Sequence, residues 1–159
     1  MGDDRILIAE DDPRTVEMFG LMLRAGGIDN EVVVARDGVE ALDYLFGTGD
    51  HAERDTSIMP QFMLLDLSMP RLDGLEVLRC LREHERTKLL PVVVFSASTA
   101  PQDIVEAYRA GANSYIDKLS AVPWHDLIPL IARYWLDANV PALTAMSAGD
   151  GTLGERAGS

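Results

Sequence analysis

The chain has 159 residues, of which 47% are hydrophobic and 25% are charged, so it is long enough for one globular domain with its own core. Its net charge of −12 repels phosphate backbones and opposes a nucleic-acid-binding function. No apolar run approaches the length of a membrane span, the first residues resemble no signal peptide, and Cys80 can form no internal disulfide, so we expect a cytoplasmic protein without a membrane partner.

Short apolar runs rich in valine, isoleucine and leucine alternate with amphipathic stretches, and glycine or proline residues stand between them. The apolar runs predict strands, and the amphipathic stretches predict helices. In chain order we expect a strand at 5–10, a helix at 13–24, a strand at 31–35, a helix at 37–46, a strand at 62–66, a helix at 75–85, a strand at 91–96, a helix at 101–110, a strand at 114–118 and a helix at 123–137.

Local features add detail to this pattern. Asp37 and Glu40 have the spacing of a capping box at the start of the second helix. Pro129 should bend the last helix, because an interior proline removes a backbone hydrogen bond. Residues 47–60 form a polar loop of unusual length for an α/β protein, and residues 141–159 have the composition of a disordered tail.

Five alternations of strand and helix predict a single α/β domain at 1–140, with a parallel sheet and helices on both of its faces. Right-handed crossovers leave few arrangements, and among them we expect the flavodoxin-like doubly wound sheet of five strands in the order 2-1-3-4-5. In such a sheet the carboxyl ends of the strands meet at one edge, where ligands bind.

Polar side chains stand at the ends of four of the expected strands. Glu10 and Asp11 close the first strand, Asp66 the third, Ser96 the fourth and Lys118 the fifth. Carboxylates crowded into one crevice repel each other by roughly 4 kcal/mol per close pair at an effective dielectric near 20, so they need raised pKa values or a divalent cation. Oxygen ligands on loops favour Mg²⁺.

A carboxylate beside Mg²⁺ can attack a phosphoryl group and form an acyl phosphate, which is the role we assign to Asp66. The Ser96 hydroxyl and the Lys118 ammonium can bind the oxygens of the transferred group. Each residue taken alone has a structural explanation, such as a solvated acidic loop, a turn cap or a surface lysine. Their joint occurrence at these strand ends favours the phosphoryl site.

These positions resemble, residue by residue, the five-residue signature of response-regulator receiver domains. The resemblance covers residues 5–136, and the segment 64–74 is its most specific part. It implies that Asp66 is the phosphoacceptor. It also implies that Asp11, Asp66 and the backbone carbonyl of Ser68 ligate Mg²⁺, while Glu10 holds a metal-bound water.

The resemblance further implies a switch. Ser96 would follow the phosphoryl group on Asp66, and Tyr115 would turn inward as Ser96 moves. The chain departs from the family at one position. In the family, the residue after this lysine, Lys118 here, is usually a proline joined to it by a cis peptide bond. Leu119 stands here instead, and a non-proline cis bond costs about 2.5–4 kcal/mol. This departure leaves open a trans or a strained loop, with a shifted position for Lys118.

The loop at 47–60 and the segments 107–115 and 134–141 look like those of small regulators that pair with phytochrome-type histidine kinases. This narrower resemblance implies a sensor histidine kinase as the phosphoryl donor and a homodimer. Tyr134 and Trp135 would form either an exposed dimer patch or part of the core.

We therefore expect a stand-alone response regulator that signals to a downstream protein, or onward in a phosphorelay. It would be no enzyme, but a phosphoacceptor that assists its own phosphorylation and dephosphorylation. Two alternatives stay open. A pseudo-receiver scaffold has the absent proline as its support, and a haloacid-dehalogenase-like phosphohydrolase would need a second acid where Ser68 stands.

Overall fold

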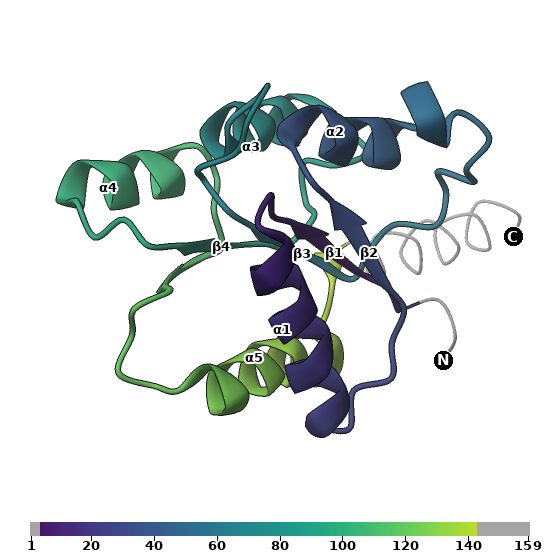
Figure 1. The fold of residues 1–159 in the computed structure, drawn as a ribbon. Coiled ribbons are helices and arrows are strands. Elements are labelled where there is room, and N and C mark those ends of the chain that lie inside the picture. Colours follow the sequence, from purple (N-terminus) through teal and green to yellow (C-terminus); the bar gives the residue numbers. More distant parts are fainter. Residues whose placement is uncertain (1–3, 143–159) are drawn as a thin grey trace, which may run out of the picture.

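The computed structural model describes residues 4–142 (Figure 1). Its strands and helices are, in chain order, β1 (Ile6–Ala9), α1 (Pro13–Ala25), β2 (Val32–Ala35), α2 (Gly38–Phe46), η1 (Gly49–His51), β3 (Phe62–Leu65), α3 (Gly74–Glu83), β4 (Val92–Ser96), α4 (Pro101–Arg109), β5 (Ser114–Asp117), α5 (Trp124–Arg133) and η2 (Tyr134–Ala138). Every expected strand and helix is present, with ends that differ by a residue or two. The exception is the last helix, which becomes a π-helix at Tyr134.

The five strands form one parallel sheet in the order β2-β1-β3-β4-β5, as the sequence predicts. Each of the neighbouring strand pairs is parallel. The register pairs Ala9 of β1 with Leu65 of β3, and Leu65 with Val94 of β4. The residues that follow β1 and β3 therefore leave the sheet at the same level.

Helices α1 and α5 cover one face of the sheet, and α2, α3 and α4 cover the other (Figure 1). Alternate residues of each strand enter opposite cores. Ile6 and Ile8 pack with Phe19 of α1, whereas Leu7 and Ala9 pack beneath α2 and α3. Because both faces of the central strands are buried, β1 and β3 are unbroken apolar runs.

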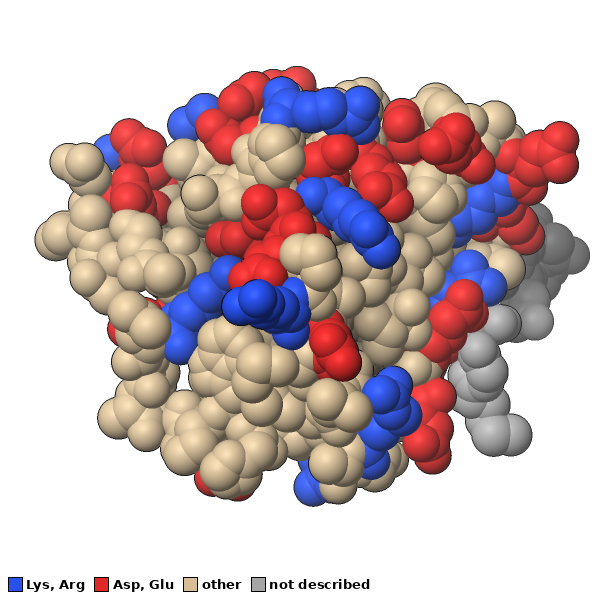
Figure 2. All heavy atoms as spheres, in the orientation of Figure 1, with Lys and Arg blue, Asp and Glu red and all other residues tan. Residues whose placement is uncertain are grey.

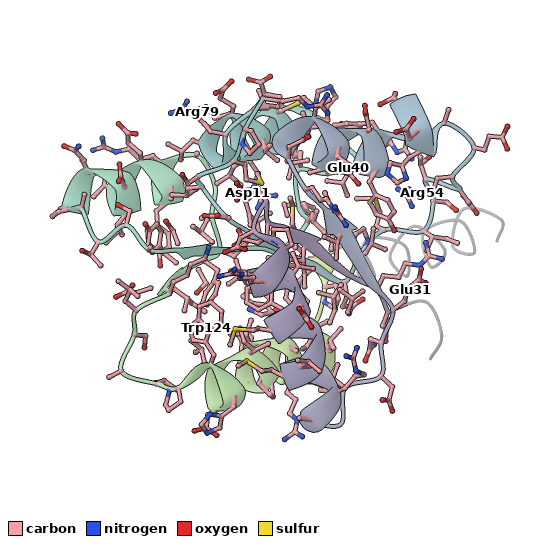
Figure 3. All side chains as sticks on the ribbon, in the orientation of Figure 1. Asp11, Glu31, Glu40, Arg54, Arg79 and Trp124 are labelled. Carbon is pink, nitrogen blue, oxygen red and sulfur yellow. The ribbon has the colours of Figure 1, made fainter. Side chains whose placement is uncertain are left out.

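The long loop at 47–60 is more ordered than its polar sequence indicates. Its Arg54 guanidinium donates to the carbonyls of Tyr44 and Ile58, at 2.6 and 2.7 Å, and lies 4.0 Å from the centre of the Tyr44 ring. Arg54 therefore ties the loop to the last turn of α2 (Figure 3).

The expected capping box is only half formed. Asp37 caps α2 by accepting the Glu40 N–H at 2.8 Å, but the Glu40 carboxylate accepts the N–H of Arg36 rather than that of Asp37. In α5 the helix continues through Pro129, which is buried beside Gly26, and the expected bend stays a prediction.

The two aromatic residues after α5 have different environments. Tyr134 is 53% exposed, whereas Trp135 packs against the core under α1 and α5. The expected tail lies, from residue 143 on, outside the described part of the chain. Within residues 4–142 no helix is both long enough and apolar enough to span a bilayer.

Candidate functional site

The candidate site lies at the carboxyl edge of the sheet. The backbone N–H groups of Glu10 and Asp66 donate to Ala35 and Ala9, both at 3.0 Å, so the sheet fixes the main chain of both residues. Their side chains are buried, as is that of Ser96, while Asp11 is exposed at the start of the loop to α1 (Figure 3). Figure 2 shows acidic side chains gathered at the centre of this face, with basic side chains next to them.

Lys118 reaches this edge from the end of β5. Its Nζ lies 2.9 Å from Glu10 Oε1 and 3.3 Å from Asp66 Oδ2. One ammonium group thus serves two buried carboxylates from two other strands. The structure brings together the three residues that the sequence placed at separate strand ends.

Burial and close contact shift the pKa values of the groups in this cluster. The pKa of Glu10 is raised to about 8, first by burial and then by the adjacent Asp66 carboxyl group, against the opposing effect of Lys118. Burial alone would lower the pKa of Lys118, but the hydrogen bond to Glu10 and the charge of Asp66 raise the pKa above its usual value. The ammonium group therefore stays charged, and this one positive charge faces the carboxyl groups of Glu10, Asp11 and Asp66.

Carboxylate oxygens of Glu10, Asp11 and Asp66 all lie within 4.8 Å of one another, a spacing at which they can hold a metal ion. Glu10 Oε2 is buried and accepts no hydrogen bond from the described residues, so it can accept one from a metal-bound water. Three hard oxygen donors with unbalanced negative charge fit a divalent cation such as Mg²⁺.

The loop after β3 folds back over Asp66. The Ser68 N–H donates to Asp66 Oδ1 at 3.2 Å, and the Gly74 N–H donates to the Leu67 carbonyl at 3.0 Å. A Cβ at Gly74 would lie 2.4 Å from the Asp66 carbonyl oxygen, so this close turn needs glycine. The role of the Ser68 carbonyl as a metal ligand stays a prediction.

The proposed switch residues meet in the loop after β4. The Ser96 hydroxyl accepts the Ser98 N–H at 3.2 Å, and the Tyr115 hydroxyl donates to the Ser98 carbonyl at 2.7 Å. Ser98 also donates its hydroxyl to Asp103 in the first turn of α4, at 2.5 Å. The sequence points to Ser96 and Tyr115 but carries no signal for Ser98, which joins them.

The absence of the usual proline does not move Lys118 away from the site. Among residues 4–142 no peptide bond is cis, so the Lys118–Leu119 bond is trans. The Leu119 side chain is 76% exposed, and its N–H donates to Asp117 Oδ1 at 2.8 Å. Trp124, for which the sequence carries no functional signal, donates its indole N–H to the Lys118 carbonyl at 2.8 Å.

The comparison with protein families gives a match over most of the described chain. The family model described as "Response regulator receiver domain" matches residues 6–123. Response regulator Rcp1 from Synechocystis sp. is 31% identical over 135 residues, which cover 83% of this chain and 88% of Rcp1.

Solved structures agree with that match. The Mn²⁺-bound form of Rcp1 has a TM-score of 0.78 at 28% identity, and the alignment covers 87% of this chain and 98% of that one. The phosphorylated cyanobacterial phytochrome response regulator RcpA has a TM-score of 0.79 at 33% identity, with the same coverage. The bacteriophytochrome response regulator AtBRR has a TM-score of 0.70 at 37% identity, covering 87% of this chain and 97% of that one.

Proposed function

The chain belongs to the response regulator receiver domain family, and on this premise we propose that it is a stand-alone phosphorylation switch whose phosphoacceptor is Asp66. One observation carries the proposal. The buried Asp66 carboxylate lies 3.3 Å from the Lys118 ammonium. It also lies close enough to the carboxylates of Glu10 and Asp11 for the three groups to hold one metal ion. In this position the Lys118 ammonium can bind the oxygens of a phosphoryl group on Asp66, and a metal ion can bind beside it as a second cation.

In the reaction that this site supports, an Asp66 carboxylate oxygen attacks the phosphorus of a phosphohistidine. The new O–P bond forms as the N–P bond breaks, and the histidine nitrogen keeps the electron pair of the broken bond. The Lys118 ammonium then binds a phosphoryl oxygen, and the Ser96 hydroxyl donates a hydrogen bond to another. The product is an acyl phosphate on Asp66.

We propose Mg²⁺ as the resident metal, held by Asp11, Asp66 and the Ser68 carbonyl, with Glu10 bound through a water. The orphaned Glu10 Oε2 and the clustered carboxylates support this choice, as does the Mn²⁺ in the structure of Rcp1. When bound, Mg²⁺ neutralises charge on the transferring phosphoryl oxygens. The same residues and metal would also promote hydrolysis of the acyl phosphate, so the protein would assist its own phosphorylation and dephosphorylation.

The output would follow from a rearrangement around Ser96. Recruiting the Ser96 hydroxyl to the phosphoryl group removes an acceptor from the Ser98 N–H, and Ser98 is bonded to both Tyr115 and Asp103. Phosphorylation therefore favours a different arrangement of the loop between β4 and α4. That loop and α4 would present the changed surface to a downstream protein or phosphorelay partner.

We propose that the phosphoryl donor is a phytochrome-type histidine kinase in the cytoplasm, where ATP is available to phosphorylate the kinase histidine. The similarity to RcpA and AtBRR supports this choice. We also propose a homodimer that uses the exposed Leu130 and Tyr134, which lie one helical turn apart. Sedimentation velocity tests the dimer: a Tyr134→Glu variant should sediment as a monomer, and a monomeric unaltered protein would contradict it.

Treatment with acetyl phosphate and Mg²⁺ tests the phosphoacceptor function. Intact-protein mass spectrometry should show one phosphoryl adduct on the unaltered protein and on Asp29→Asn, which alters an exposed carboxylate, but none on Asp66→Asn. An unaltered protein that takes up no phosphoryl group would support a pseudo-receiver scaffold. Steady turnover of phosphate monoesters would instead support a phosphohydrolase.

A further inference from the structure

We propose that Trp124 is a positioning residue for phosphoryl transfer, because its indole holds the backbone of Lys118 so that the ammonium group reaches the phosphoacceptor. This inference rests on the proposed function of the site. The contact that carries it is the hydrogen bond from Trp124 Nε1 to the Lys118 carbonyl, at 2.8 Å. Trp124 touches no reacting atom and acts only through Lys118.

The indole ring is itself held firmly. The partly buried ring packs against the core between the sheet and helix α1 (Figure 3), with its centre 5.6 Å from the ring of Phe19 and 5.2 Å from that of Phe95. Both phenylalanine side chains are fully buried. The position of the indole N–H is therefore fixed by the core, and an oriented donor in this place restrains the carbonyl that it binds.

Hydrogen bonds hold the backbone on both sides of the Lys118 side chain. The Lys118 N–H donates to the Ser96 carbonyl at 2.9 Å, and the Leu119 N–H donates to Asp117 Oδ1 at 2.8 Å. The bond from Trp124 fixes the carbonyl between these two N–H groups. These three bonds connect Lys118 to β4, to its own turn and to the first residue of α5.

This turn needs such restraint because of the residue that follows Lys118. A proline would fix its own φ angle and stiffen the chain, but Leu119 does neither, and its side chain is largely exposed. Lys118 must nevertheless place its Nζ within 3.3 Å of Asp66 from the end of a flexible four-carbon stem. In this chain, the indole of Trp124 supplies the stiffness that Leu119 lacks.

The substitution Trp124→Phe tests the inference, because it keeps an aromatic ring against Phe19 and Phe95 and removes the N–H donor. Trp135→Phe is the matched control, since it makes the same chemical change at a half-buried residue of η2. With acetyl phosphate and Mg²⁺, Trp124→Phe should be phosphorylated roughly three- to tenfold more slowly than the unaltered protein, the factor that one neutral hydrogen bond provides. Trp135→Phe should react at nearly the unaltered rate.

A double-mutant cycle separates positioning from a general loss of structure. If Trp124 acts through Lys118, then Trp124→Phe should cause no further slowing in a Lys118→Ala background. Amide hydrogen exchange supplies a readout that needs no reaction. The Leu119 amide should exchange severalfold faster in Trp124→Phe than in Trp135→Phe, because the turn that it closes has lost its anchor.

Equal phosphorylation rates in the two tryptophan variants would overturn the inference while leaving the proposed function intact. An undiminished effect of Trp124→Phe in the Lys118→Ala background would also overturn it, since the indole would then act elsewhere. An unaltered protein that forms no adduct would overturn the proposed function, and the inference would fall with it.

Discussion

A single ammonium group, that of Lys118, lies against two buried carboxylates, and much of the chemistry at this edge follows from that imbalance. When both are ionised, Glu10 and Asp66 carry more negative charge than Lys118 offsets, and one Glu10 oxygen has no hydrogen-bond partner among the described residues. Burying unbalanced charge is costly, so the site is stabilised by a proton, a metal ion or both. The cluster therefore suits the cation that we propose to bind there.

The raised pKa of Glu10 predicts a pH-dependent stability in the metal-free protein. Glu10 binds a proton more tightly when folded, with a pKa of about 8, than when unfolded, so its contribution is fully present below about pH 4.5 and is lost as the pH rises through about 8. Glu10→Gln should remove this loss of stability at high pH. Above pH 8 the metal-free variant should therefore be more stable than the metal-free unaltered protein, by a few kcal/mol at most.

Urea denaturation in the presence of a chelator measures this difference across the pH range. Glu17→Gln, which alters an exposed carboxylate of α1, is the control and should leave the pH profile unchanged. Parallel profiles for Glu10→Gln and the unaltered protein would contradict the raised pKa.

The acidic and basic residues of the site could be identified from the sequence because they end apolar strands, and a parallel sheet brings such ends together. Glu10, Asp66 and Lys118 do meet there. Trp124 and Ser98 could not be identified in this way. The indole of Trp124 binds a main-chain carbonyl, and the main chain of Ser98 is bound by the side chains of Ser96 and Tyr115. An aromatic residue at a helix start or a serine in a loop has many ordinary explanations, so neither position carries a signal for these bonds.

Among the larger elements, the loop at 47–60 shows how a charged side chain can organise a segment without regular structure. The sequence predicted a polar loop there and carried no signal for its order, because an arginine in a polar stretch usually faces solvent. In the structure Arg54 donates to four carbonyls, two of them at the end of α2, where helical carbonyls lack partners. The guanidinium group therefore also caps the helix.

Arg54→Ala should destabilise the protein by about 2 kcal/mol, because several partly buried carbonyls lose their donor at once. Arg86→Ala is the control. Arg86 is exposed, and it donates a hydrogen bond to the Thr56 carbonyl of the same loop. This substitution should cost less than about 0.5 kcal/mol. Urea denaturation gives both values, and limited proteolysis should cut Arg54→Ala faster within residues 47–60. Equal losses in the two variants would contradict this role of Arg54.

For the protein as a whole, the order of the strands followed from the alternation of elements and the handedness of crossovers, which leave few topologies. The burial of the residues after α5 could not be predicted from the sequence in the same way. Tyr134 and Trp135 are adjacent in sequence, yet one is exposed and the other packs on the core, and the change to a π-helix at this point has no sequence signal. The dimer stays a prediction.

The net charge of −12 and the acidic cluster predict that Mg²⁺ stabilises the folded protein. A ligand at a hundredfold excess over its Kd stabilises by about 2.7 kcal/mol, so Mg²⁺ should raise the Tm of the unaltered protein by several degrees. NaCl at equal ionic strength controls for screening of the overall charge. Asp11→Asn should lose most of the Mg²⁺-specific increase, and an increase of the same size in this variant and the unaltered protein would contradict the metal site.

Chemical mapping of the phosphorylated residue tests whether Asp66 receives the phosphoryl group. Borohydride reduces an acyl phosphate on aspartate to homoserine, and tandem mass spectrometry locates that residue in a peptide. After treatment with acetyl phosphate and Mg²⁺, homoserine should be found at position 66 and at no other aspartate. Homoserine at position 11 or elsewhere, or a label that resists borohydride, would show that the phosphoryl group is carried by another side chain.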